Sequence, residues 1–403
     1  MHSLEKVQEI ILSSVKLLPA ELIDLTDGLH RTVVSDVAAV IPRPSFDESM
    51  RDGYVFPLSG GHEKGTQRFT IVDEIPAGRV YVEELLPGTA CRIMTGGCVP
   101  KGGVRVVPHE NCVEQNGEVI VENQLIPSAL YIRKTGSEIV QSEVLVRCGV
   151  QLQPMHLALL SSSGVRSVVV STRPSAGFLC TGSELKNLSG GLEKGHKFSS
   201  NSFLLEGLFA SSDVYSEDFG IVEDNKSDLL EFFIRAKGRG LDLLISTGGT
   251  GPGKYDLVRE AFVEAGGQVI LTELEMRPGK SILFGKLGGT LFFGMPGPPF
   301  AVQTLFNLLV EPVLSAMQGR EGSWPQKVQA YLQHQVTVKH NDVVRLKDGV
   351  LILEGGRCSV RLAERFETSN CYVLLQPGEG HYTKGTLVDV FLSFRSNTGL
   401  CYF

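Results

Sequence analysis

The chain contains 403 residues, of which 42% are hydrophobic and 21% are charged, and its formal net charge at pH 7 is −7. This length exceeds one typical hydrophobic core, so we expect several domains. The acidic balance argues against nucleic-acid binding through overall charge attraction, whereas a small anionic ligand remains compatible with a locally basic site.

The cysteines and the N-terminal segment indicate the compartment. Eight scattered cysteines include no Cys-x-x-Cys pair, and several lie in apolar runs. This distribution favours buried free thiols in a reducing environment over disulfides or a zinc finger. Residues 1–6 carry no apolar signal segment, and we find no run long enough to span a bilayer. We therefore expect a cytoplasmic protein without membrane association.

In chain order, the first elements are a helix and a β-rich segment. Residues 4–17 carry apolar side chains at helical spacing, which predicts a helix. Residues 46–135 contain short β-like runs between glycine and proline turns, which predicts a small β-rich insert. Residues 148–170 return to a helical and then an extended pattern.

Strands and helices alternate from about residue 175 to residue 318. The pattern predicts strands at 177–180, 214–222 and 241–246, extended runs at 268–276, 281–286 and 290–294, and helices at 201–211, 227–237, 256–265 and 299–317. This alternation predicts a doubly wound α/β domain whose sheet is at least partly parallel. Beyond Gly319, short runs between turns predict a small C-terminal β-barrel or sandwich.

Three glycine-rich turns in the α/β segment are the most informative feature. Residues 181–184, 246–253 and 294–299 each follow an apolar run. In an open parallel sheet such turns meet at the carboxyl edge, where ligands bind, and glycine lets backbone N–H groups approach an anion. The arrangement predicts a phosphorylated small molecule bound to the α/β domain.

The second turn has two interpretations. It contains Gly248, Gly249, Gly251 and Gly253, and these form either a backbone nest for a phosphate or pterin, or a tight turn before a helix. Asp256 is an N-cap, a metal ligand, or both.

The charged candidates also have two interpretations. Arg277 and Lys280 flank Pro278-Gly279, and such a rigid pair of cations suits an oxyanion such as phosphate or molybdate. A solvated turn is the alternative. Asp52, Glu184 and Asp224 lie near turns and suit a hard cation such as Mg²⁺, although each alone is commonly a solvated side chain.

Several segments resemble the molybdopterin molybdenumtransferase family, which includes MoeA and the E domain of gephyrin. In the order of that family, they are Pro42–Tyr54, Glu74–Gly78, Leu86–Pro100, Ser246–Gly249, Arg277–Lys280 and Phe293–Gly297. The Ile93-Met94-Thr95-Gly96 and Pro278-Gly279-Lys280 blocks are the specific ones, and the resemblance covers nearly the whole chain.

The resemblance implies an elongated subunit with four domains. They are a discontinuous N-terminal domain at 1–45 and 136–174, a β-rich insert at 46–135, a MogA-like α/β pterin-binding domain at 175–320 and a C-terminal β-barrel at 321–403. It also implies a homodimer whose active cleft lies between the α/β domain of one subunit and the insert of the other. A MogA-like adenylyltransferase and molybdoenzymes are the implied partners, and nucleic acid and membranes are not.

The resemblance also implies a reaction and its residues. Adenylylated molybdopterin and molybdate are the substrates, AMP is released, and Mg²⁺ assists. By motif, the implied catalytic residues are Asp52, Thr95, Glu184, Asp256 and, with a looser match, Asp224. The implied metal ligands are Asp52, Glu184 and Asp256. The implied cofactor-binding residues are Gly248, Gly249, Gly251, Gly253, Arg277, Lys280 and Gly297.

The chain departs from the family pattern in its loops. Ser183 and Ser200 replace acids, Arg277 replaces a lysine, and Pro298 replaces an asparagine. Two hypotheses follow. The protein is an active molybdenumtransferase, or it is a catalytically degenerate relative that binds pterin or acts as a scaffold. An unrelated nucleotide-binding α/β enzyme is a remote third.

Overall fold

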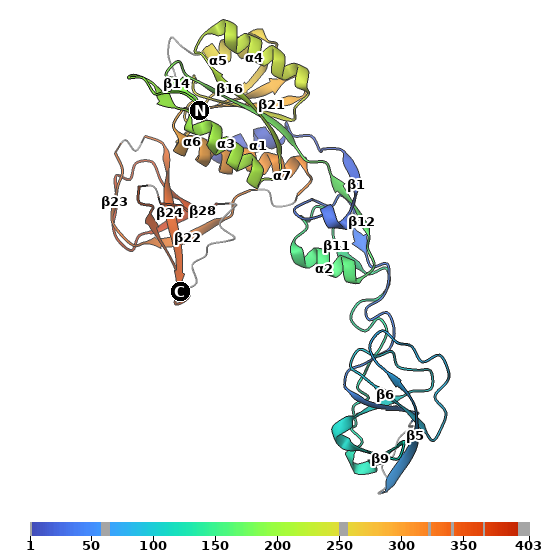
Figure 1. Cartoon of the computed structure of the whole chain (residues 1–403). Coiled ribbons are helices and arrows are strands. Elements are labelled where there is room, and N and C mark those ends of the chain that lie inside the picture. The colour runs from blue at the N-terminus through green and yellow to red at the C-terminus, as the bar shows by residue number, and fades with distance from the viewer. Residues whose placement is uncertain are drawn as a thin grey trace.

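The computed structural model describes residues 2–57, 65–249, 257–320, 324–339, 342–365 and 367–393. The molecule is elongated, with a body at one end and an arm that ends in a separate β-rich unit (Figure 1). The chain leaves the body along β1 (Ala20–Asp24) and returns along β12 (Ser167–Ser171), and the residues between these strands form the rest of the arm. These two strands pair antiparallel, so the arm is one ribbon at its root.

The body is built on a six-stranded sheet in the order β16-β13-β17-β21-β20-β18. The first four strands are parallel and the last two are antiparallel. The strands are β13 (Ser175–Thr181), β16 (Tyr215–Val222), β17 (Leu243–Thr247), β18 (Gln268–Leu271), β20 (Leu283–Leu287) and β21 (Thr290–Met295). The predicted doubly wound α/β domain is confirmed. The strand β18 is shorter than the extended run predicted at 268–276, because the chain leaves the sheet after Leu271.

Helices cover both faces of this sheet. The helices are α3 (Ser200–Ser211), α4 (Lys226–Arg239) and α5 (Leu257–Glu264), and a short parallel pair, β14 (Leu185–Lys186) and β15 (Lys197–Phe198), precedes α3. Along β17, Leu243 and Ile245 join the core on the α3 side, while Leu244 joins the core under α4 and α5. The first three residues of the strand are apolar because both of its faces are buried.

The predicted helix at 299–317 consists of three segments. They are α6 (Pro299–Leu305), a π-helical turn (Phe306–Val310) and α7 (Glu311–Met317). Pro312 lacks the N–H that would donate to the preceding turn, which accounts for the wider turn there. An 18-residue stretch within residues 299–317 has a mean hydropathy of 1.4 and is long enough to cross a membrane, which corrects the expectation that no run has that length. However, 83% of the stretch is buried inside the protein, as in a core helix.

The N-terminal helix α1 is shorter than predicted and spans Leu4–Leu12. It ends there because the hydroxyls of Ser13 and Ser14 bond the carbonyl of Ile10 and compete with the helix backbone. Its apolar face, including Val7 and Ile11, is buried in the core of the body.

The middle of the arm is a small mixed domain. It contains η1 (Leu25–Asp27), α2 (Pro154–Ser162) and the paired strands β2 (Val37–Ala38) and β11 (Val144–Val146). Its core includes Val33, Leu152, Leu160 and Val170.

The end of the arm is a curled six-stranded sheet in the order β7-β4-β6-β5-β9-β8. The strands are β4 (Gly53–Phe56), β5 (Thr66–Ile75), β6 (Thr89–Ile93), β7 (Arg105–Pro108), β8 (Cys112–Gln115) and β9 (Glu118–Glu122), with short 3-10 turns at His109–Asn111 and Asn123–Leu125. The paired strands β3 (Glu48–Ser49) and β10 (Ile132–Arg133) join it to the rest of the arm. This sheet forms the predicted β-rich insert.

The C-terminal unit is a closed barrel, because β24 pairs with both β25 and β26. Its strands are β22 (Lys327–Leu332), β24 (Val344–Glu354), β25 (Arg357–Leu362), β26 (Cys371–Leu375) and β28 (Leu387–Leu392), and β23 (Val336–Thr337) pairs with β27 (His381–Tyr382). The strand β19 (Met276–Arg277) of the body adds to β24, so the barrel is joined to the body by strand pairing. A barrel rather than a sandwich therefore ends the chain, and the predicted multidomain fold class is confirmed.

Candidate functional site at the carboxyl edge of the sheet

The three glycine-rich turns share one edge of the body sheet. The strands β13, β17 and β21 are neighbours in parallel register (Figure 1). Cys180 is level with Thr247, and Thr247 is level with Met295, so the residues that follow leave the sheet together. The Gly248 N–H donates to the Met295 carbonyl at 2.9 Å and ties the second turn to the third.

Close packing accounts for two glycines of the second turn. Gly248 has a φ of +97°, and a Cβ there would lie 2.3 Å from the Thr181 carbonyl oxygen. Gly249 has a φ of +65°, and a Cβ there would lie 2.7 Å from Val258 Cγ2. Both positions therefore require glycine for the backbone alone, whatever the turn binds. The other predicted residues of this loop, Gly251, Gly253 and Asp256, lie outside the described residues.

Two carboxylates flank the end of β13. The Thr181 hydroxyl donates to Asp224, which follows the neighbouring strand β16. Glu184 folds back over the first turn, where a Cβ on Gly182 would lie 2.8 Å from Glu184 Oε2. The structure thus brings Glu184 and Asp224 to the same strand end. The sequence predictions do not include Thr181, whose only sequence signal is its place as the first residue of a glycine turn.

Buried polar atoms at this edge lack partners. The Asn201 side-chain amide donates to the Gly297 carbonyl at 2.8 Å, which links α3 to the third turn. Asn201 Oδ1 and the hydroxyls of Ser246 and Thr247 are buried and have no hydrogen-bond partner in the described part of the chain. Such atoms are costly to leave unpaired, and a bound water or ligand would give them partners.

Serines rather than acids form the N-terminus of α3. The hydroxyls of the N-cap Ser199 and of Ser202 lie 2.9 Å apart, and Cys180 Sγ lies 3.4 Å from the Ser202 hydroxyl. The first turn of α3 carries no acidic residue. A helix N-terminus attracts negative charge, and an uncharged first turn leaves that attraction uncancelled.

The two predicted cations lie beside the C-terminal barrel. Arg277 Nη2 and Lys280 Nζ lie 3.4 and 4.0 Å from the same carboxylate oxygen of Asp342, and the two cationic side chains are 39% and 42% exposed. A Cβ on Gly279 would lie 2.7 Å from Leu305 Cδ2, so the loop is pressed onto α6. Exposed pairs of this kind contribute about 0–1 kcal/mol. An anion can therefore compete with Asp342 for the two cations. The sequence pattern did not predict Asp342 as their neighbour.

Asp52 and Thr95 form a separate pair on the insert. The backbone N–H and the hydroxyl of Thr95 donate to Asp52 Oδ1 at 2.7 and 2.8 Å. These two bonds hold the pKa of the Asp52 carboxyl below its usual range, with the backbone bond having the larger effect. The pair is open to solvent, so Asp52 is presented as a fixed carboxylate.

The described site residues fall into separate groups within one chain. Asp52 and Thr95 lie at the far end of the arm, whereas the glycine turns, Glu184 and Asp224 lie on the body (Figure 1). Among the described residues, no group of three or more His, Cys, Asp or Glu side chains could hold a metal ion. Mg²⁺ commonly keeps several waters and takes one or two protein carboxylates together with substrate phosphates. Glu184 and Asp224 fit that mode, and Asp52 of the same chain does not join them.

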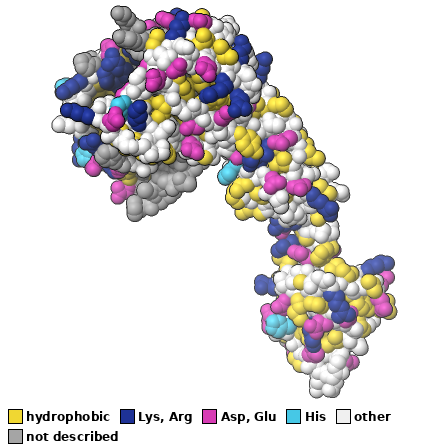
Figure 2. All heavy atoms as spheres, turned by 45° about the horizontal axis from the view of Figure 1, so that its top comes forward, with side chains coloured by type: hydrophobic (Ala, Val, Ile, Leu, Met, Phe, Trp, Pro, Cys, Tyr) yellow, Lys and Arg dark blue, Asp and Glu magenta, His cyan; other side chains and the backbone are white. Residues whose placement is uncertain are grey.

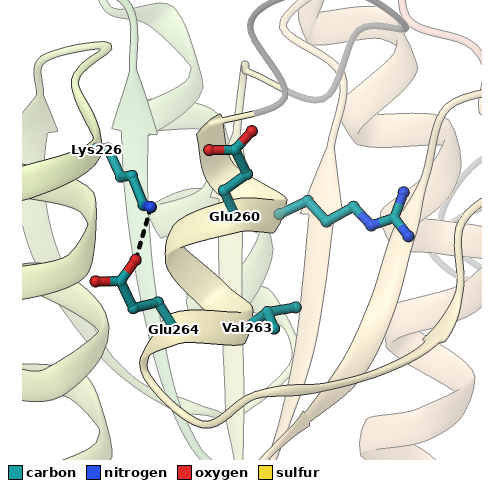
Figure 3. A pocket seen from close by; sticks show the side chains of 5 residues that line it. Lys226, Glu260, Val263 and Glu264 are labelled. Carbon is teal, nitrogen blue, oxygen red and sulfur yellow. Dashed lines mark ion pairs between the residues drawn. The ribbon is translucent and has the colours of Figure 1, made fainter.

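A cavity of about 520 Å³ opens between α4 and α5, and the predicted residues do not line it. Figure 3 shows its lining side chains, Lys226, Arg259, Glu260, Val263 and Glu264. Lys226 and Glu264 form an ion pair of 2.7 Å across it. Charges of both signs also alternate over the face of the molecule in Figure 2, where no large area of one sign stands out.

Replacing Thr95 by valine should raise the pKa of Asp52 above its wild-type value but not to the ordinary aspartate value, because the stronger backbone bond remains. A Thr95→Ser control should preserve the low value. The two Thr95 bonds are complete while Asp52 is ionised and weaken as the pH falls through its lowered pKa. Carbon-13 NMR titration of Asp-labelled protein, with Asp52 assigned through Asp52→Asn, measures this; equal midpoints in wild type and Thr95→Val would contradict the role of the hydroxyl.

Gly248→Ala and Gly297→Ala form a matched pair. The first places a Cβ against the Thr181 carbonyl at a positive φ and should cost at least about 2 kcal/mol. The second has room, since the nearest atom to its Cβ is Gly248 Cα at 4.0 Å, and should change stability by less than about 0.5 kcal/mol. Thermal unfolding checks both, and equal melting temperatures would show that the turns are not packed as described.

Comparison with known proteins agrees with this geometry. Residues 2–164 match the family described as "MoeA N-terminal region (domain I and II)", and residues 177–316 match "Probable molybdopterin binding domain". A structure titled as a molybdopterin biosynthesis MoeA protein from Pyrococcus horikoshii superposes with a TM-score of 0.82 at 25% identity, covering 97% of this chain and 99% of that one.

Curated relatives extend over the same length. A molybdopterin molybdenumtransferase of Nostoc sp. is 30% identical over 334 residues, which cover 80% of this chain and 76% of the relative. One from Haemophilus influenzae is 29% identical over 382 residues, covering 92% and 93%. The fold, the shared edge of glycine turns and these similarities agree. The chain therefore belongs to the MoeA family of molybdopterin molybdenumtransferases, which acts in molybdenum cofactor biosynthesis.

Proposed function

We propose that this protein transfers molybdenum from molybdate to adenylylated molybdopterin and releases AMP. The observation that most supports this is the one edge at which three glycine turns, Glu184, Asp224 and buried polar atoms without partners in the described chain come together. Both substrates are anions, and this edge combines an uncharged helix N-terminus with close backbone turns. The sulfurs that bind molybdenum belong to the substrate, so no cysteine of the protein is needed.

The hydrogen-bond donors that an anion can use at this edge differ from the glycine N–H groups that the sequence pattern indicates. The Gly248 N–H is already bonded to Met295, so it does not donate to a ligand. The Asn201 amide N–H is likewise bonded to the Gly297 carbonyl, so the backbone N–H groups at the start of α3 remain as donors. The loop of Arg277 and Lys280 is the proposed molybdate site, where the oxyanion would replace Asp342 as the shared counter-ion.

A divalent cation fits the carboxylates of the edge. We assign Glu184 and Asp224 as the residues that would hold Mg²⁺ together with the substrate phosphates. Bound there, the ion would neutralise charge on the phosphoanhydride. The chain itself supplies the orientation of Asp224, through the hydroxyl of Thr181.

We also propose a homodimer in which the insert of one subunit completes the edge of the other. The carboxylate of Asp52 is fixed by Thr95 on the insert, and the insert lies at the end of a long arm (Figure 1). Hydrophobic side chains are visible along the arm in Figure 2, and the cross-strand pair Leu22 and Val169 is exposed on the β1–β12 ribbon. Exposed apolar pairs of this kind favour association.

We propose that the protein acts in the cytoplasm. A MogA-like adenylyltransferase would supply its substrate, and molybdoenzymes would receive its product. A second candidate function, pterin binding without turnover, is favoured by one observation. The first turn of α3 carries no acidic residue, and Ser183 and Ser200 are neutral where the family pattern implies acids, which leaves Glu184 and Asp224 as the carboxylates assigned to the described edge.

Purified protein mixed with adenylylated molybdopterin, molybdate and Mg²⁺ should release AMP, which anion-exchange chromatography quantifies. Asp224→Asn should lower the rate at least about 100-fold, because it removes a carboxylate from the phosphate-binding edge. Calorimetry on the same samples separates the two functions. Pterin binding without AMP release, beside an active homologue as control, would favour the non-catalytic function.

A heterodimer of Asp52→Asn and Asp224→Asn subunits should recover about half of the wild-type activity, because a shared cleft leaves one of its two sites intact. The two homodimers should each be nearly inactive. The control places both substitutions in one subunit and pairs it with wild type, which damages both shared sites. Activity in the control and none in the first heterodimer would show that each site lies within a single chain.

A further inference from the structure

The arm joins the body at a narrow root. The Leu18 N–H donates to the Met317 carbonyl at 2.8 Å, and the Thr172 N–H donates to the Pro19 carbonyl at 2.8 Å. The first bond attaches the β1–β12 ribbon to the end of α7, and the second closes the ribbon at its root. A two-stranded ribbon bends and twists easily, so its angle to the body needs a further constraint.

A buried polar cluster between the arm and the body provides this further constraint on the angle. Arg320 Nε donates to the Thr32 hydroxyl at 2.8 Å, and Arg320 Nη2 donates to Gln318 Oε1 at 3.0 Å. The Thr32 hydroxyl also donates to Gln318 Oε1 at 3.4 Å. Thr32 belongs to the arm, whereas Gln318 and Arg320 directly follow α7 on the body. Thr32 and Gln318 are almost completely buried, at 0% and 4% exposure.

The cluster is anchored firmly on the body side. The Gln318 amide donates to the Leu314 carbonyl at 3.1 Å. The buried carboxylate of Glu311 accepts from the Ser212 hydroxyl at the end of α3. Burial lowers the pKa of the Arg320 guanidinium, and attraction to Glu311 and Asp213 opposes that change. The guanidinium is thus held among groups fixed to α3 and α7.

The arm side is also tied to the ribbon. The Ser171 N–H donates to the Thr32 carbonyl at 2.9 Å, and Arg31 Nη2 donates to the Ser171 carbonyl at 2.7 Å. Movement of Thr32 therefore carries β12 with it. A buried polar cluster contributes little net stability, but its directional bonds are satisfied in one geometry only.

We propose that Arg320 is a positioning residue that fixes the angle of the arm through Thr32 and so delivers Asp52 and Thr95 to the active edge of the partner subunit. This inference rests on the shared cleft of the proposed function. The insert lies at the far end of the arm (Figure 1), so a small rotation at the root becomes a large displacement of Asp52. The reaction needs that carboxylate within about 1 Å of its working place.

Three variants and one control test this role. Arg320→Met keeps the length of the side chain and removes every donor, and Thr32→Val removes only the hydroxyl. Arg320→Lys keeps the charge and loses the planar fork. Arg239→Met is the control, because Arg239 is 57% exposed on the same body and pairs only with Glu217 among the interactions of its side chain shown by the structure.

The direct measurement is the distance distribution between two spin labels in one subunit. Genetically encoded labels at the exposed positions Ile234 on α4 and Val113 on β8 report the angle between body and insert. Dilution with unlabelled protein removes distances between subunits. We expect a broader distribution in Arg320→Met and Thr32→Val, an intermediate one in Arg320→Lys, and the wild-type distribution in Arg239→Met.

The kinetic measurement separates positioning from folding. Arg320→Met should lower kcat about tenfold and change KM for adenylylated molybdopterin less than about twofold, because the edge that binds the pterin is untouched. An unchanged distance distribution overturns the role of Arg320 in the arm, and a broad distribution with unchanged kcat overturns its role in the reaction. If Arg320→Met does not fold, Thr32→Val tests the same bond. If the wild type itself releases no AMP, the proposed function fails, and the distance distribution still decides whether Arg320 fixes the arm.

Discussion

The approach of Gly248 to the ends of two neighbouring strands organises the whole functional edge. Its N–H bonds the Met295 carbonyl, and its missing side chain leaves room for the Thr181 carbonyl. Because the turns are pressed together, Asp224 is brought to the Thr181 hydroxyl, and Asn201 is brought to Gly297. A parallel sheet alone aligns its carboxyl ends, and this contact turns the alignment into a compact site.

The C-terminal barrel is joined to the loop of Arg277 and Lys280 through β19. This short strand leaves the body sheet and pairs with β24, and Asn307 in the π-helical turn donates to the buried Tyr372 hydroxyl of β26 at 2.7 Å. The loop of Arg277 and Lys280 is therefore held between two domains, with a barrel carboxylate beside it. This placement makes the cation loop rigid while its counter-ion stays exchangeable with an incoming anion.

In the proposed dimer, the arm has to hold the exposed carboxylate of Asp52 at a fixed place away from its own body. On the insert, Thr95 fixes the Asp52 side chain by two bonds. At the root, Arg320 and Gln318 surround the Thr32 hydroxyl with directional bonds. Apolar packing would tolerate a range of angles, whereas buried hydrogen bonds do not. Both ends of the arm thus use polar contacts where orientation matters.

The sequence by itself determined the order of strands and helices in the body, the β-rich insert, the C-terminal β unit and the family. Apolar periodicity and glycine turns are local signals, and the run Leu243–Ile245 identifies a strand covered on both faces. Local signals failed where neighbours compete, as at Ser13, which ends α1 early, and at Pro312, which widens a turn of the long helix. Only the tertiary structure decided that Gly248 serves packing, that Asp342 faces the two cations and that Asp52 lies far from Glu184. Those facts depend on contacts between residues distant in sequence, which no periodicity encodes.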